Sequence, residues 1–247
     1  MGDFELFSIQ EGCSSSGKSM GSTRVGVFLQ ARLSSTRLPQ KVLLPLKGGN
    51  VLQHALRSLR KIKADVYALL TDYNSGGALE QYAVEEGFSL FMGAEDDVLQ
   101  RFTSAVLFFK VERVIRATGD NPLVSWQLAS EILELHEKKG ADLSHFINIP
   151  LGTGVEAVEA SALLAAENES ADPYEHEHIT TFLYRHPERF TILEIEGPAE
   201  CLLSGRRVTL DTDSDYKLIR NIFSDLYINQ PIAAEDIVAW LKRKSAE

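Results

Sequence analysis

The stretch Val25-Gly-Val-Phe-Leu-Gln-Ala-Arg-Leu-Ser-Ser-Thr-Arg-Leu-Pro-Gln-Lys41 joins an apolar run to a basic loop. The run at 25–29 is typical of a buried strand in a parallel sheet. The loop that follows combines Arg32, Arg37 and Lys41 with three hydroxyl side chains. Arginine offers a planar fork of donors and lysine a point charge, which is how proteins hold phosphate groups. We therefore expect a phosphate-binding loop directly after the first strand.

The charge balance of the whole chain makes this loop unusual. The 247 residues include 25 Lys and Arg against 35 Asp and Glu, for a net charge of −10. An acidic chain argues against a nucleic acid or an anionic membrane as partner. Basic residues concentrated in one loop of such a chain indicate a local anion pocket more than a solvated surface loop. Hydrophobic residues make up 44% of the sequence, enough for the core of one large α/β domain.

Cysteine content and hydropathy point to a cytoplasmic protein. The two cysteines, Cys13 and Cys201, form no C-x-x-C pair, so neither a zinc site nor a disulfide framework is indicated. No apolar run reaches the length of a membrane span, and the first residues lack a signal-peptide pattern.

Residues 12–19, GCSSSGKS, match the phosphate-loop pattern G-x-x-x-x-G-K-[ST]. That motif works only between a strand and a helix whose N-terminus receives the phosphate. Only residues 20–24 separate it from the strand at 25–29, which leaves no room for a helix. We interpret residues 1–24 as a flexible N-terminal extension with a chance match, and residues 25–247 as a single domain. A P-loop NTPase is the weakest alternative.

From residue 25 onward, strand and helix patterns alternate. The first half predicts strands at 25–29, 65–70, 88–92 and 113–117, and helices at 51–61, 78–86, 96–110 and 126–139. The second half predicts strands at 141–146, 154–158, 190–195 and 207–210, and helices at 160–168, 174–185, 211–227 and 233–244. This rhythm is typical of an α/β fold, with a mostly parallel sheet covered by helices on both faces.

Polar motifs follow each of the first four strands. The basic loop, Thr71-Asp72, residues 93–97 and residues 119–121 all come at strand ends. Because ligands of open α/β sheets bind beyond the carboxyl ends of the strands, we expect one site at this rim.

Two acids that are far apart in sequence are candidate metal ligands. Asp120 and Asp211 each follow a predicted strand, and two carboxylates facing a phosphate cradle would bind Mg²⁺. The alternative for Asp211 is a helix N-cap, with Asp213 and Asp215 in the first helical turn.

The motifs together resemble a known family. Residues 29–41 closely resemble the A-R-x-x-S-x-R-L-P-x-K signature of the sugar-acid cytidylyltransferases, which include the CMP-KDO and CMP-sialic acid synthetases. Within them the chain is most similar to the spore coat polysaccharide biosynthesis branch. Five further segments in collinear order carry the resemblance: Gly93-Ala-Glu-Asp-Asp-Val-Leu-Gln-Arg-Phe102, Arg116-Ala-Thr-Gly-Asp-Asn-Pro-Leu123, Glu177-His-Ile-Thr180, Pro187-Glu-Arg-Phe190 and Leu210-Asp-Thr-Asp213.

This resemblance implies a three-layer α/β/α fold of the nucleotide-diphospho-sugar transferase (Rossmann-like) type with a mostly parallel mixed sheet. It implies a Mg²⁺-dependent reaction of CTP with a sugar or sugar acid that yields a CMP-sugar and pyrophosphate for surface polysaccharide biosynthesis. It also implies a homodimer, with residues 144–196 as a sugar-binding and dimerisation region.

The resemblance further implies roles for single residues. Nucleotide binding falls to Gln30, Ala31, Arg32, Ser35, Arg37, Lys41, Thr71 and Asp120. Sugar binding falls to Asn121, Glu156, Glu177 and His178, metal binding to Asp120 and Asp211, and catalysis to Arg37, Lys41 and Asp211.

The chain departs from the family pattern at two positions. Asp213 stands where proline is common, and Gly154 stands where an acid is usual. Two alternatives remain open: a glycosyltransferase of similar (GT-A-like) fold, whose D-x-D motif Gly119-Asp120-Asn121 does not match, and a non-catalytic nucleotide-binding protein of the same fold.

Overall fold

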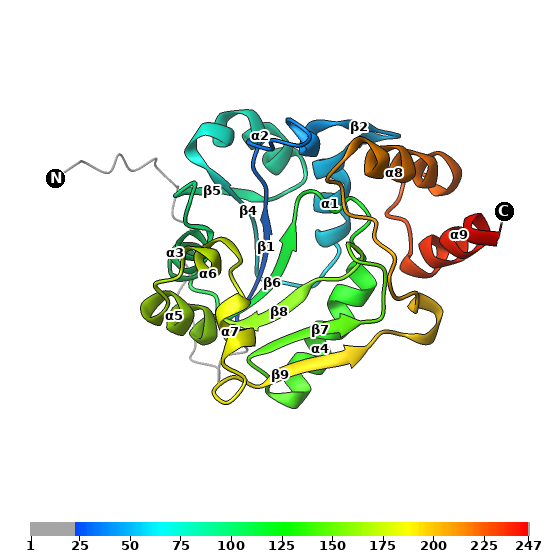
Figure 1. Ribbon diagram of the computed structural model, residues 1–247. Coiled ribbons are helices and arrows are strands. Elements are labelled where there is room, and N and C mark those ends of the chain that lie inside the picture. Colours follow the sequence, from blue (N-terminus) through cyan, green and yellow to red (C-terminus); the bar gives the residue numbers. More distant parts are fainter. Residues whose placement is uncertain (1–22, 247) are drawn as a thin grey trace, which may run out of the picture.

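The computed structural model describes residues 23–246 and is built around a seven-stranded sheet in the order β5-β4-β1-β6-β8-β7-β9 (Figure 1). Its strands are β1 (Val25–Gln30), β4 (Val66–Asp72), β5 (Ser89–Gly93), β6 (Arg113–Thr118), β7 (Leu143–Ile147), β8 (Glu156–Glu159) and β9 (Ile192–Glu196). Strand β8 runs antiparallel to β6 and β7, while the other neighbouring pairs are parallel. The short strands β2 (Pro45–Leu46) and β3 (Gly49–Asn50) form a separate ribbon.

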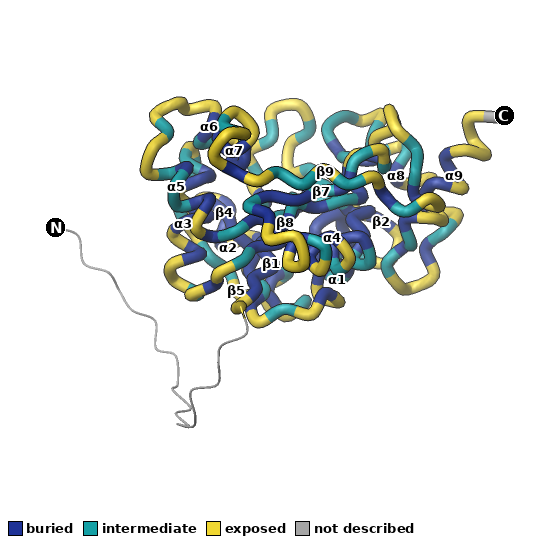
Figure 2. Tube along the Cα trace, turned by 90° about the horizontal axis from the view of Figure 1, so that it is seen from below, coloured by how far each residue is buried: buried dark blue, intermediate teal, exposed yellow. Residues whose placement is uncertain are grey.

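Helices cover both faces of the sheet. They are α1 (Val51–Leu59), α2 (Tyr73–Glu85), α3 (Val98–Phe109), α4 (Trp126–Lys139), α5 (Ala160–Glu169), α6 (Pro173–Glu177), α7 (Thr181–Arg185), α8 (Asp213–Leu226) and α9 (Ala234–Ala246). One buried cluster joins the sheet to α1, α2 and α4, and another joins it to α3, α5 and α7. Helices α8 and α9 form a third cluster beside α1. Figure 2 shows the buried strands enclosed between these layers. The α/β fold predicted from the sequence is confirmed.

Strand β1 lies at the centre because its side chains are apolar on both faces. Leu29 packs in the cluster with α1 and α4, while Phe28 faces α3 on the other side. The ring of Phe28 lies 6.1 Å from that of Phe102 and 5.9 Å from that of Phe109. Strand β1 is thus held by both helical layers, and the loop after it starts from a fixed point.

The strand predicted at 207–210 is wrong. This segment is extended, but it forms only an isolated bridge between Arg207 and Leu151. Gly152 follows at φ +103°, and a Cβ there would lie 2.9 Å from Thr209. A positive φ lies outside the strand region, so the backbone leaves the extended conformation directly after Leu151 and the pairing stops at one bridge.

Two predicted helices differ from the observed ones. The helix at 174–185 is two short helices, α6 and α7, separated at 178–180. The turn lets the Thr180 hydroxyl donate to Glu156 while Phe182 is buried in the core. Helix α2 begins at Tyr73, earlier than the predicted 78, because Asp72 caps it by accepting from the Ser75 N–H at 2.8 Å.

Two further sequence expectations fall partly or wholly outside the described residues. The phosphate-loop pattern at 12–19 and Cys13 lie outside them, whereas Cys201 is a buried free thiol. Within residues 23–246, no helix is both long enough and apolar enough to cross a membrane.

The packing of β1 predicts a large stability effect for Phe28→Ala. Phe28 is fully buried, and its removal should lower the free energy of unfolding by about 3–5 kcal/mol. Denaturant titration followed by circular dichroism measures this. Phe108→Ala, at a position 63% exposed, is the matched control and should cost about 1 kcal/mol or less. Equal losses in the two variants would contradict the central position of β1.

Candidate functional site

The basic loop of residues 31–41 leaves the carboxyl end of β1 and is fixed at both ends. The Ala31 N–H donates to the Leu70 carbonyl at 3.0 Å, and the Leu33 N–H donates to the Ser75 hydroxyl at 2.9 Å. At the other end, Lys41 opens a short 3₁₀ helix (Lys41–Leu43) whose Val42 is buried. Between these points the side chain of Arg37 is 70% exposed.

The ammonium group of Lys41 is the centre of the site. Its Nζ donates to Asp120 Oδ2 at 2.6 Å, to Asp211 Oδ1 at 2.8 Å and to the Leu210 carbonyl at 2.8 Å. An ammonium group has three N–H donors, so all three are used. The side chain is only 14% exposed, which strengthens these contacts.

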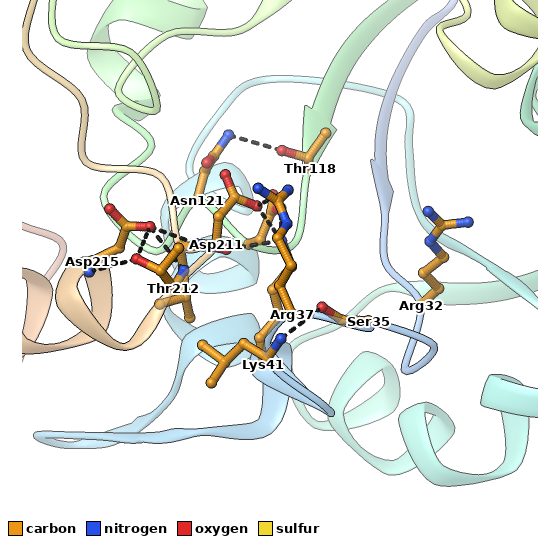
Figure 3. A network of polar contacts seen from close by, with 12 residues as sticks. Arg32, Ser35, Arg37, Lys41, Thr118, Asn121, Asp211, Thr212 and Asp215 are labelled. Carbon is orange, nitrogen blue, oxygen red and sulfur yellow. Dashed lines mark hydrogen bonds and ion pairs between the residues drawn. The ribbon is translucent and has the colours of Figure 1, made fainter.

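Asp211 also forms ion pairs with two arginine side chains. Arg207 Nη2 lies 2.6 Å from Asp211 Oδ2. Arg37 Nη2 lies 3.5 Å from Asp211 Oδ1, and Figure 3 shows the two side chains next to each other. Desolvation by itself would raise the pKa of Asp211. The hydrogen bonds and charges of Lys41 and Arg207 outweigh desolvation and hold this pKa below its usual value.

Backbone contacts explain how Asp211 reaches Asp120. The Leu210 N–H donates to the Asp120 carbonyl at 3.0 Å, which aligns the extended segment with the loop after β6. Helix α8 then begins at Asp213, after the N-cap Thr212, whose side chain forms a capping box with Asp215. The N-cap is therefore Thr212, and Asp211 keeps its carboxylate for the site. Asp213 and Asp215 lie in the first turn, as predicted.

These groups line one cleft of about 670 Å³ at the carboxyl ends of the central strands. Most of the predicted site residues line it: Gln30, Ala31, Arg32, Ser35, Arg37, Lys41, Asp120, Asn121, Glu177, His178 and Asp211. Arg32 Nη2 and Glu177 Oε1 face each other at 3.5 Å between the loop and α6. A second hollow of about 700 Å³ lies between α8 and α9 and shares Arg207 with the cleft.

Two predicted site residues do not line the cleft. Thr71 is fully buried in β4. Glu156 lies opposite Arg116 across the β6–β8 pair and accepts from Arg116 Nη1 at 2.7 Å. The hydroxyl of Tyr184 also donates to Glu156, at 3.0 Å. Burial opposes ionisation of Glu156, but Arg116 and Tyr184 outweigh it and lower the pKa. In this structure Glu156 therefore holds Arg116, and it is Arg116 that lines the cleft.

Sequence reasoning did not single out five polar residues of the cleft, namely Arg101, Arg116, Thr118, Arg207 and Thr209. Arg101 and Arg116 lie within the family motifs quoted above, so those motifs carried a usable signal. Arg207 lies four residues before Asp211 but belongs to no such motif, and its contact with Asp211 depends on the fold.

The carboxylate oxygens of the site fit a divalent cation that a ligand also helps to bind. Two carboxylates from separate segments converge on one ammonium nitrogen, so one cation can contact both. Within residues 23–246 there is no group of three or more His, Cys, Asp and Glu side chains suited to a metal. Mg²⁺ commonly binds one or two carboxylates and completes its coordination shell with phosphate oxygens and water. The carboxylates of Asp120 and Asp211 fit this type of coordination.

Comparisons with known proteins point to one family. A family model described as "Cytidylyltransferase" matches residues 27–238. The chain is 32% identical to the spore coat polysaccharide biosynthesis protein SpsF of Bacillus subtilis, over 87% of this chain and 93% of that protein.

Two solved structures have a similar fold. A cytidylyltransferase from Leptospira borgpetersenii matches with a TM-score of 0.84 at 26% identity, covering 91% of this chain and 96% of that one. A CMP:2-keto-3-deoxy-manno-octonic acid synthetase complexed with CTP matches with a TM-score of 0.65 at 15% identity, covering 82% and 99%.

The charge arrangement predicts a pH window for Asp211→Asn. Because the pKa of Asp211 is lowered on folding, its carboxylate stabilises the protein above the unfolded value of about 3.9, and this contribution is lost as the pH falls through the lower folded pKa. Asp211→Asn should therefore lower the thermal midpoint of the ligand-free protein at pH 7, with a difference from wild type that shrinks only below about pH 3.9. Thermal melts from pH 3 to 7 test this, and a difference that disappears between pH 7 and 5 would contradict it.

Proposed function

The chain belongs to the cytidylyltransferase family, and on that basis we propose that it joins CMP from CTP to a sugar or sugar acid, releasing pyrophosphate, in a Mg²⁺-dependent reaction of surface polysaccharide biosynthesis. The similarity to SpsF supports the polysaccharide role. One observation carries the proposal most directly: Lys41, Asp120 and Asp211 meet at the carboxyl end of the sheet beside the basic loop.

The basic loop suits the triphosphate. The guanidinium of Arg37 is exposed at the cleft, and Ser35 of the same loop also lines it. Lys41 lies at the base of the loop, where its ammonium can exchange the two carboxylates for phosphate oxygens. Phosphoryl transfer needs positioned cations more than covalent chemistry from the protein, and these residues supply them.

Asp120 and Asp211 would hold the divalent cation. When bound, this cation would neutralise charge on the phosphates and so ease the departure of pyrophosphate. Asp211 is better suited to holding a cation than to accepting a proton, because its pKa lies below the usual range of a carboxyl group.

In the transfer step, a sugar hydroxyl oxygen loses its proton to solvent water and forms a bond to the α-phosphorus, while the bond from that phosphorus to the bridging oxygen of pyrophosphate breaks. We assign the sugar to the part of the cleft bounded by Asn121, Glu177 and His178. Glu156 acts there through Arg116, which it holds in place by the 2.7 Å contact. The same proposal includes a homodimer through residues 144–196, a region that contains the edge strand β9.

The decisive assay measures pyrophosphate release with each of the four nucleoside triphosphates, crossed against a panel of sugar acids and sugar phosphates. We expect release only with CTP and one class of sugar. Binding of CTP without turnover of any sugar would favour the non-catalytic alternative, and consumption of a CMP-sugar without pyrophosphate would favour a glycosyltransferase.

Two substitutions separate binding from turnover. Arg37→Ala should weaken CTP binding about tenfold, because one charge-assisted phosphate contact is lost. Asp211→Asn should lower kcat by about a hundredfold or more while CTP binding changes less. Calorimetric titration and steady-state kinetics measure these effects.

Arg243→Ala and Asp236→Asn are matched controls, since both residues are exposed on α9 and outside the cleft. Unchanged kinetics in both site variants would remove the assignment of this cleft.

A further inference from the structure

A buried arginine forms part of the cleft wall away from Lys41. Arg101 lies on α3, is 3% exposed and lines the cleft. Among residues 23–246 no carboxylate lies within ion-pair distance of it. A buried cation without a paired anion lowers the stability of the fold. Its presence therefore suggests a ligand that it binds.

Arg101 is held rigidly by backbone groups. Its Nε donates to the Ala94 carbonyl at 3.1 Å and its Nη2 to the Glu95 carbonyl at 3.3 Å. Gly93 leaves room for it, since a Cβ there would lie 2.9 Å from Arg101 Cγ. Two of five N–H donors are used in these contacts, so the others remain for a molecule in the cleft.

Gln30 faces the same region from the sheet. Side chains two residues apart in a strand share a face, so Gln30 points to the side of β1 on which Phe28 contacts Phe102 of α3. Arg101 precedes Phe102 on that helix. Gln30 lines the cleft, and its buried Oε1 has no hydrogen-bond partner within the described structure. A donor-only group and an unsatisfied acceptor therefore line the same cleft, from α3 and from the face of β1 that packs on α3.

The charges around Arg101 suit an uncharged ligand group. Desolvation lowers the pKa of Arg101, and the nearby carboxylates of Asp72, Glu95 and Asp97 oppose this, while Arg32 adds to it. These carboxylates offset the positive charges of Arg101 and Arg32, and Asp97 is itself paired with His176 at 2.8 Å. This end of the cleft therefore lacks the excess of positive charge that a triphosphate needs. Figure 3 shows Arg32 standing apart from Arg37 and Lys41, so the phosphate-binding cations belong to the other part of the cleft.

We infer that Arg101 and Gln30 form a nucleobase-reading pair that selects cytosine over uracil, an inference that rests on the proposed function. Cytosine presents two acceptors, O2 and N3, and a donor, its 4-amino group. Arg101 donates to the acceptors and Gln30 Oε1 accepts from the amino group. Uracil carries a hydrogen on N3, which would face the donors of Arg101, and Arg101 cannot accept it. A site built in this way rejects the analogue because polar groups are left unpaired.

The test is calorimetric titration of the full chain with CTP, UTP and inorganic tripolyphosphate in the presence of Mg²⁺. In Arg101→Met, CTP affinity should fall about 10- to 100-fold, with UTP and tripolyphosphate changed less than about threefold. Gln30→Leu should lower CTP affinity in the same selective way. Arg57→Met is the matched control because Arg57 also donates to a loop carbonyl, that of Gly48, but lies outside the cleft.

Four results would overturn this inference. These are equal loss of tripolyphosphate and CTP binding, an unchanged ratio of CTP to UTP affinity in the variants, no preference for CTP in the wild type, and a change in sugar KM alone. If Arg101→Met melts without a cooperative transition, Arg101→Lys and Gln30→Leu decide by the same ratio. Failure of the wild type to bind any of these nucleotides would instead overturn the proposed function, on which the inference rests.

Discussion

One ammonium group ties the site together. Lys41 comes from the loop after β1, Asp120 from the loop after β6, and Leu210 and Asp211 from the extended segment before α8. Two carboxylates brought this close together, and largely out of solvent, repel each other unless a cation lies between them. Lys41 supplies that cation in the ligand-free chain. The same pair of carboxylates would suit a metal ion if, as proposed, the Lys41 ammonium moved onto phosphate oxygens.

The cleft has two parts with different electrostatics. Around Asp211, the cations of Arg37, Lys41 and Arg207 stand beside carboxylates, an arrangement suited to a polyanion with its metal. Around Arg101, carboxylates offset the cations, and the groups left without partners are N–H donors of Arg101 and the Oε1 acceptor of Gln30. A nucleoside triphosphate has the same division between charged phosphates and an uncharged base. The division of charge within the cleft therefore follows the division of charge within the proposed substrate.

The local sequence pattern was sufficient to predict the layers of the fold and the position of the basic loop. Apolar runs of strand length alternate with amphipathic segments, and polar residues follow the strands, so the rim of the sheet could be predicted without coordinates. Contacts between distant segments could not. Asp211 reaches the site because the Leu210 N–H bonds to the Asp120 carbonyl. Glu156 lies opposite Arg116 because β8 pairs antiparallel with β6. The burial of Arg101 depends on how α3 packs, which residue spacing does not reveal.

The proposed function requires that the basic loop and the two distant acids form one nucleotide and metal site. Anomalous diffraction from crystals grown with CTP and Mn²⁺ tests it most directly. We expect a manganese peak between the carboxylates of Asp120 and Asp211, in contact with phosphate oxygens, and Lys41 Nζ moved from its present position onto the triphosphate. A peak away from these two acids, or a triphosphate that does not contact residues 31–41, would contradict the claim.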